Sequence, residues 1–134
     1  MLNKTKNDLY KTKISYRPLL MKVKSAETRQ IKTSDFCNDK LILTVESSFG
    51  LSFEISEGWI VGKNQQVQKK GLWYSPGLYN GEKCIPFDSV IAKTLEYYSC
   101  VSVGEIIGKT VEVYPDSKNF LAIVGTEMTL SEAV

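Results

Sequence analysis

Histidine is missing from this sequence, and cysteine is scarce. Histidine is the only side chain whose unperturbed pKa lies between pH 5 and 8, so Ser–His, Cys–His and His–metal chemistry are excluded. The three cysteines, at 37, 84 and 100, match no zinc-binding spacing, and an odd number argues against a disulfide framework. The carboxylates show neither the spacing of a metal loop nor that of a paired acid and base. We therefore expect a binding protein that is not an enzyme and holds no metal or cofactor.

A long apolar run is missing as well. None approaches the ~20 residues that a membrane-spanning helix needs, and no apolar block follows the lysine-rich residues 1–13, as a secretory signal would require. These absences predict a cytoplasmic protein without membrane contact. The 134 residues fit one domain, which we divide into a basic flexible arm at 1–18, a folded domain at 19–125 and a tail at 126–134.

The net charge of +2 is unevenly distributed along the chain. Residues 1–40 contain ten Lys and Arg against four Asp and Glu, whereas residues 71–134 contain four against eight. This asymmetry favours a basic arm or face that contacts a polyanion, although a solvated lysine-rich tail has the same composition.

Alternation of apolar and polar residues predicts strands in the first half of the chain. In Leu19–Ile31, Met21 and Val23 alternate with lysines, as in a half-buried strand. Further on, the apolar residues fall almost entirely on odd-numbered positions: Leu41, Leu43, Val45, Phe49, Leu51, Phe53 and Ile55. This stripe predicts one long curved strand, or two strands around Gly50, with all seven side chains buried. The polar stretch Gly62–Lys70 is expected to be a loop.

One helix is predicted at Pro86–Cys100, where Asp88 or Ser89 can cap its start. Its apolar stripe consists of Ile91, Leu95 and Tyr98. Two strands follow, within 106–114 and 120–124. About three long strands, one helix and two strands predict a mainly β fold: a small OB-fold-like antiparallel barrel with one helix between the third and fourth strands.

The last part of the domain also carries a sequence pattern. The segment IPFDSVIAKTLEYYS is followed by EIIGKTVEVYPD, with a Gly-Lys step into a strand, and then by FLAIVGTE. In this order, Ile85–Val124 resembles the C-terminal half of small OB-fold single-stranded-DNA-binding proteins of phages and mobile elements. The resemblance covers about 40 residues and implies binding of single-stranded nucleic acid, or reuse of the scaffold for protein contacts. The basic arm and residues 62–80 have no counterpart in that pattern.

Single-strand binding requires cations along a groove and aromatic faces on which bases stack. The candidate residues are Lys22, Lys24, Arg29 and Lys32 on the first strand, with Trp59, Lys69, Lys70, Trp73, Tyr74 and Tyr79 further on. Trp73 and Tyr74 are adjacent, so on a strand they point to opposite faces and one is exposed. The alternatives are that the aromatic residues are buried and that the lysines line an ordinary solvated strand face.

These observations lead to two hypotheses about function. The first is a non-catalytic protein that binds single-stranded nucleic acid, DNA rather than RNA. The second is a phage-type adaptor or inhibitor of a protein complex, which uses the aromatic Gly71–Tyr79 loop as a hydrophobic anchor. The sequence leaves the oligomeric state open.

Overall fold

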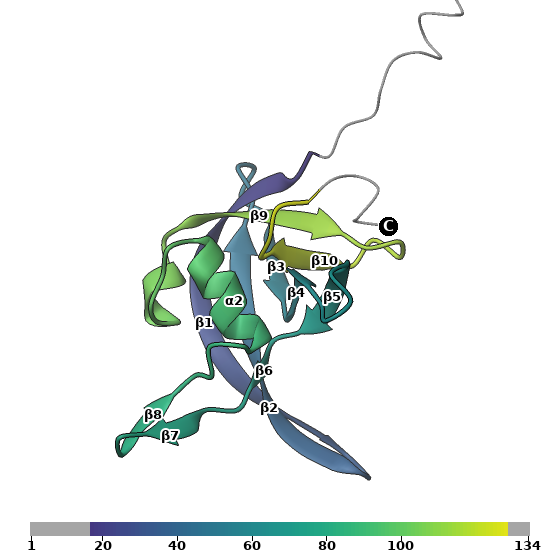
Figure 1. Cartoon of the computed structure of the whole chain (residues 1–134). Coiled ribbons are helices and arrows are strands. Elements are labelled where there is room, and N and C mark those ends of the chain that lie inside the picture. The colour runs from purple at the N-terminus through teal and green to yellow at the C-terminus, as the bar shows by residue number, and fades with distance from the viewer. Residues whose placement is uncertain (1–16, 129–134) are drawn as a thin grey trace, which may run out of the picture.

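The alternating residues do form strands, and residues 17–128 are mainly β with one α-helix. The computed structural model describes residues 17–128 (Figure 1), so the predicted arm and tail lie largely outside the described residues. The strands are β1 (Leu19–Thr33), β2 (Phe36–Glu46), β3 (Ser52–Ile55), β4 (Glu57–Val61), β5 (Val67–Gly71), β6 (Trp73–Tyr74), β7 (Gly77–Tyr79), β8 (Glu82–Cys84), β9 (Thr110–Pro115) and β10 (Leu121–Val124). The helix is α2 (Val90–Tyr97), and a short 3-10 turn, η1, covers Gly104–Ile106.

Most of the strands belong to one sheet. Its order is β3-β2-β1-β9-β10-β4-β5, and β6 pairs with β2. Strands β4 and β10 are parallel, so the prediction of a purely antiparallel sheet is wrong for this pair. The hydrogen-bonded order ends at β3 on one side and at β5 on the other, and the two end strands are not paired with each other.

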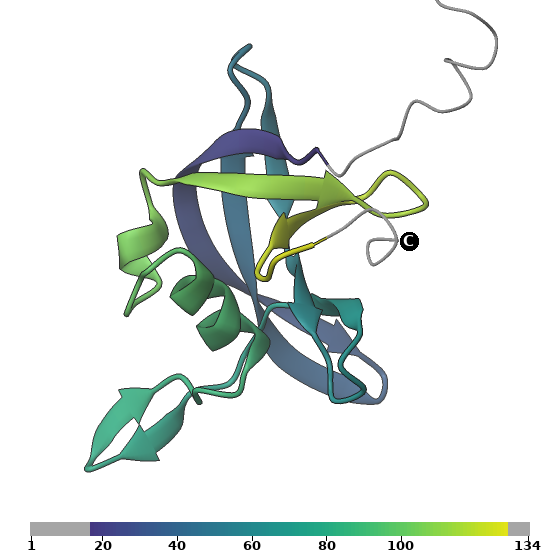
Figure 2. The ribbon, with the colours of Figure 1, turned by 45° about the horizontal axis from the view of Figure 1, so that its top comes forward.

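Strands β1 and β2 form a long, curved hairpin. The pairing register shifts between Val23 and Ser25, which marks a bulge in β1. A bulge bends its strand and increases the local twist, and Figure 2 shows β1 curving away from the hairpin end to lie beside β9. The first residues of β1, Leu19–Lys22, pair with β9 in this way.

The helix α2 lies over the concave side of the sheet, where its apolar side meets the core (Figure 2). Ser89 caps its start, and the Ser89 Oγ accepts a hydrogen bond from the backbone N–H of Ala92 at 3.1 Å. Ile91 and Leu95 are buried, as their spacing predicts. Tyr98 follows the last helical turn, and its hydroxyl accepts a hydrogen bond from the backbone N–H of Glu112 in β9 at 3.0 Å. The predicted helix is therefore confirmed, with shorter bounds.

The odd-numbered stripe is only partly buried. Leu41, Leu43, Val45 and Ile55 lie in the core, but the exposed fractions of Phe49, Leu51 and Phe53 are 90%, 60% and 37%. A turn interrupts the stripe here, because the Ser47 Oγ accepts hydrogen bonds from the backbone N–H groups of Phe49 and Leu51. Gly50 has a φ of +82°, which favours glycine. Phe49 and Leu51 lie in this turn, which extends beyond the core, and Phe53 follows on β3, the end strand of the sheet. The prediction that all seven residues are buried is therefore wrong for three.

The segment between β4 and α2 contains more strand than the sequence predicts. Residues 67–70 of the expected loop, together with Gly71, pair with β4 as strand β5. Strands β7 and β8 form a separate hairpin that projects from the body (Figure 1). Its two-residue turn is Asn80-Gly81, with φ values of +50° and +80°, as in a type I′ turn.

No helix among residues 17–128 is long and apolar enough to cross a membrane.

Candidate functional site

The four cations predicted on β1 do not form one stripe. Lys22 and Lys24 are exposed near the start of the strand, and Lys32 lies near its other end, ten residues or about 30 Å further along the strand than Lys22 at ~3.3 Å per residue. Beyond the bulge, alternation places Lys32 and Arg29 on opposite faces of β1. The four cations are thus spread along β1 and over both of its faces, so they do not form the predicted basic face.

Arg29 is paired with two carboxylates. Its Nε donates a hydrogen bond to Glu27 Oε1 at 3.0 Å, and its Nη1 donates to Glu54 Oε1 at 3.0 Å. These bonds raise the pKa of Arg29, and the bond from Arg29 lowers the pKa of the Glu54 carboxyl. To reach Glu54 on β3, the Arg29 side chain crosses β2 at the level of Ile42, which is buried.

Trp73 lies on the same outward face as Arg29. It pairs with Lys40 across β6 and β2, and Lys40 in turn pairs with Arg29, so the three side chains share one side of the sheet. The Lys40 Nζ lies 4.8 Å from the centre of the Trp73 ring, in a cation–π contact. The Phe36 ring meets Trp73 edge-on, with centroids 5.0 Å apart.

The adjacent aromatic pair behaves as the sequence predicts. Trp73 is 38% exposed, whereas Tyr74 is half-buried and packs against the core. Gly71 leaves room for the indole, because a Cβ there would lie only 2.7 Å from Trp73 Nε1. Trp73 is thus the exposed member, and its ring is positioned by Gly71, Lys40 and Phe36.

Lys69 extends this face to β5 and the β9–β10 turn. It lies two residues before Gly71 on the same strand and therefore faces the same way. Its ammonium group forms ion pairs with Asp116 and with Glu57, the latter at 3.5 Å. The hydrogen bond between Lys69 and Asp116 raises the pKa of Lys69 and lowers the pKa of Asp116. We call Arg29, Phe36, Lys40, Lys69 and Trp73 together the Trp73 face.

Three other predicted residues lie away from the Trp73 face or are covered. Trp59 is 5% exposed, and its Nε1 donates a hydrogen bond to the Tyr114 carbonyl at 3.0 Å, so bases cannot stack on it. Lys70 pairs with Gly58, which faces α2, so it lies on the opposite side of the sheet. Tyr79 is 71% exposed, but it belongs to the projecting hairpin (Figure 1).

The sequence reasoning missed Phe36 and Lys40. Both lie on β2, but they precede the apolar stripe that begins at Leu41, so the alternation did not identify them. A hairpin tip at Ser34-Asp35 is the signal that would have placed Phe36 on a strand.

The described domain carries no excess of positive charge. Residues 17–128 contain 13 Lys and Arg and 13 Asp and Glu. These residues contain no group of three or more Cys, Asp or Glu side chains placed to hold a metal ion, and their three cysteines are free thiols.

No family model matches the chain, and neither the curated proteins nor the solved structures yield a significant match.

Proposed function

We propose that the chain binds single-stranded nucleic acid, DNA rather than RNA, across the Trp73 face. The observation that carries this proposal is the half-exposed Trp73 ring, set on a strand face between Phe36 and Lys40. An aromatic platform flanked by cations is the arrangement that proteins use to stack bases and hold the backbone of a single strand.

The strand connections support a further proposal, that the sheet is an OB-like barrel. Only Ser56 separates β3 from β4, so the two can be counted as one bent strand. The sheet then runs from this strand through β2, β1, β9 and β10 and returns to it through the parallel pair of β10 with β4. On this count α2 lies between the third and fourth strands. In OB-folds the face of the second and third strands binds oligonucleotides, and here β2 carries Phe36 and Lys40.

Energies of known size favour displacement of Lys40 by a base. A cation–π contact at an exposed site contributes about 0.5–1 kcal/mol, whereas stacking of a base on an aromatic ring contributes about 1–3 kcal/mol. A base can therefore take the place of Lys40 over the Trp73 ring. The released ammonium group is then available to a phosphate next to that base.

The Arg29 ion pairs can open in the same way. Glu27 and Glu54 are exposed partners, with about half of each side chain in solvent. Exposed ion pairs contribute only about 0–1 kcal/mol, so a phosphate oxygen can replace one carboxylate at small cost. Because the described domain is neutral, stacking contributes most of the affinity within it, and residues 1–16 add the excess of lysine.

Tryptophan fluorescence tests the proposal. The chain has two tryptophans, the buried Trp59 and the exposed Trp73. Titration with a 12-nucleotide single-stranded DNA should quench the emission of the wild type. In Trp73→Phe the remaining emission from Trp59 should not change. Quenching that persists in Trp73→Phe, or none in the wild type at low salt, would refute the proposal.

A protein partner is the second candidate, and the β7–β8 hairpin is the observation that favours it. Leu78 and Tyr79 on this projecting hairpin are 77% and 71% exposed. Large apolar side chains on a protruding element are typical of protein-binding anchors. Tyr79→Ser separates the two candidates, since nucleic-acid binding across the Trp73 face predicts unchanged DNA affinity in this variant. If the wild type does not bind DNA, the hairpin becomes the leading candidate site.

A further inference from the structure

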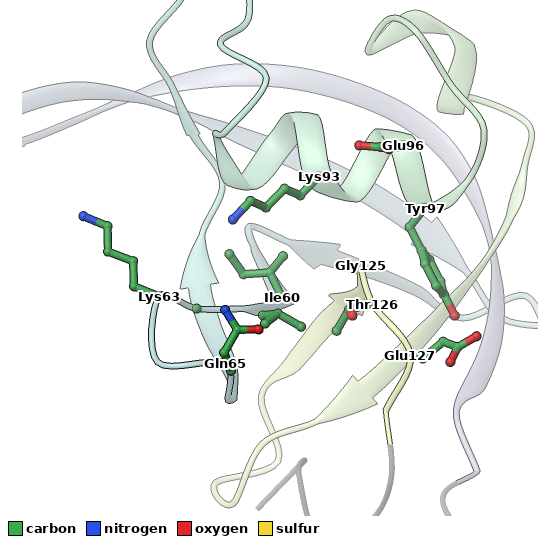
Figure 3. A pocket seen from close by; sticks show the side chains of 11 residues that line it. Ile60, Lys63, Gln65, Lys93, Glu96, Tyr97, Gly125, Thr126 and Glu127 are labelled. Carbon is green, nitrogen blue, oxygen red and sulfur yellow. The ribbon is translucent and has the colours of Figure 1, made fainter.

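A concave site lies on the opposite side of the sheet from the Trp73 face. It is an open groove of about 780 Å³ between α2, the β4–β5 hairpin and residues 125–127 (Figure 3). This size falls in the range of small-molecule sites, about 300–1,000 Å³. None of the residues of the Trp73 face lines this groove, so the groove is a separate site.

One end of the groove is cationic. Lys63 follows β4, Lys93 lies on α2, and Figure 3 shows both side chains on the same side of the groove, together with Gln65. Unlike the charged groups of Arg29 and Lys69, the ammonium groups of these two lysines have no ion-pair or hydrogen-bond partner among residues 17–128. Two unpaired ammonium groups beside an amide form a site for an anionic group such as a phosphate.

The other end of the groove is aromatic and acidic. Figure 3 shows Tyr97 and Glu127 together there, with Ile60 and Thr126 between them and the lysines. The Tyr97 hydroxyl donates a hydrogen bond to Glu112 Oε1 at 3.0 Å. Burial, Glu112 and Glu127 raise the pKa of Tyr97 to about 12, so this phenol stays neutral at physiological pH. A carboxylate here can accept hydrogen bonds from an amino group, while the phenol ring offers an apolar edge.

We infer that this groove binds a nucleotide, with its phosphate at Lys63 and Lys93 and its base toward Tyr97 and Glu127. A ligand that joins an anionic group to a planar base with an exocyclic amine matches both ends of the groove. Adenine and cytosine carry such an amine, and thymine does not. The inference stands on the groove's own residues and is independent of the Trp73 face. The phosphate can belong to a free nucleotide or to the 5′ end of a strand.

Amide chemical shifts in the ¹⁵N-labelled full chain test the inference, with dAMP, dTMP, deoxyadenosine and inorganic phosphate as probes. Titration with dAMP should shift the amides of Gly62, Lys63, Gly125 and Thr126. The affinity should fall at least tenfold in a Lys63→Gln/Lys93→Gln double variant. A Lys24→Gln/Lys83→Gln variant, which loses the same charge elsewhere, should bind dAMP like the wild type.

The other probes test the role of each end. Deoxyadenosine and dTMP should bind more weakly than dAMP, because each lacks one of the two recognised groups. Inorganic phosphate that binds as tightly as dAMP, equal loss of affinity in both double variants, or shifts confined to other residues would overturn the inference.

Competition with dAMP by a 5′-phosphorylated oligonucleotide, but not by its unphosphorylated form, would identify a strand end as the source of the phosphate. No such competition would identify a free nucleotide. Trp73→Ala should leave the dAMP shifts intact, so this site and the Trp73 face can fail separately.

Discussion

At the scale of single residues, the position of the Trp73 ring depends on a glycine. A Cβ at position 71 would come within 2.7 Å of Trp73 Nε1 and 3.2 Å of Lys40 Cε. Gly71→Ala should therefore move the indole without unfolding the domain, and the affinity for single-stranded DNA should fall by about tenfold, within the range of one lost stack. Gly77→Ala is the matched control, because a Cβ there meets nothing within 4 Å. Equal DNA affinity of the two variants would show that the indole position does not matter.

The sequence predicts that both Leu95 and Phe49 are buried, but only Leu95 lies in the core. Leu95 on α2 is 6% exposed, whereas Phe49 is 90% exposed. Leu95→Ala should lower the free energy of unfolding by about 2–5 kcal/mol. Phe49→Ala should change it by no more than about 0.5 kcal/mol, as for surface positions. Urea denaturation followed by circular dichroism measures both, and a large loss in Phe49→Ala would mean that this turn packs against something in solution.

The two tryptophans show what a single sequence can predict at this scale. The sequence predicts that one of Trp73 and Tyr74 is exposed, because strand alternation is a local rule, and the structure shows that it is Trp73. Trp59 was wrongly placed among the binding residues. Its burial depends on Ala122, Val124 and Met128, which come from a distant part of the chain. No local pattern around position 59 contains that information.

At the scale of elements, the ion pair between Lys69 and Asp116 joins β5 to the β9–β10 turn. The Asp116 Oδ1 also accepts hydrogen bonds from the backbone N–H groups of Lys118 and Phe120, at 2.8 and 2.9 Å. The hydrogen bond from Lys69, and then those from the turn, lower the pKa of Asp116 below its ordinary value of 3.8. Because the folded-state pKa is lowered, this contribution to stability is complete above the ordinary pKa and is lost as the pH falls through the lowered value.

Asp116→Asn tests that contribution, because the amide side chain of the variant retains an oxygen acceptor for the turn but carries no charge. At pH 7 the variant should have a lower free energy of unfolding than the wild type. The difference should begin to shrink as the pH falls below about 4, where the carboxyl group becomes protonated in the unfolded chain. It should vanish below the lowered pKa, where folded Asp116 is protonated as well. Urea denaturation at pH 7 and at pH 3 gives the comparison. A difference that stays constant with pH would mean that the carboxylate charge does not stabilise the fold.

The elements themselves were predicted unevenly. The first strand and the helix capped by Ser89 both depend on neighbours in sequence, and the structure contains both. The parallel pair of β4 with β10 joins residues more than 60 positions apart, and alternation alone does not identify the partner of a strand. The same limit applies to the bulge in β1, because it is a shift in the pairing with β2.

At the scale of the whole molecule, the excess of positive charge lies outside the described domain. Residues 1–13 contain four lysines and one aspartate. For single strands, the slope of log affinity against log salt is about −0.7 per neutralised phosphate. Deletion of residues 1–13 should therefore flatten the slope by up to ~3 units if all four lysines contact phosphates. Fluorescence titrations from 50 to 300 mM salt measure the slope, and an unchanged slope would exclude these lysines from the interface.

The affinity of Trp73→Ala for single-stranded DNA, measured at several salt concentrations beside the wild type, shows whether a base stacks on Trp73. Stacking on Trp73 releases no counterions, so its loss should weaken binding by about 1–3 kcal/mol at every salt concentration. The salt slope should stay the same. An affinity equal to that of the wild type, or no binding by the wild type at 50 mM salt, would refute binding of single-stranded DNA across the Trp73 face.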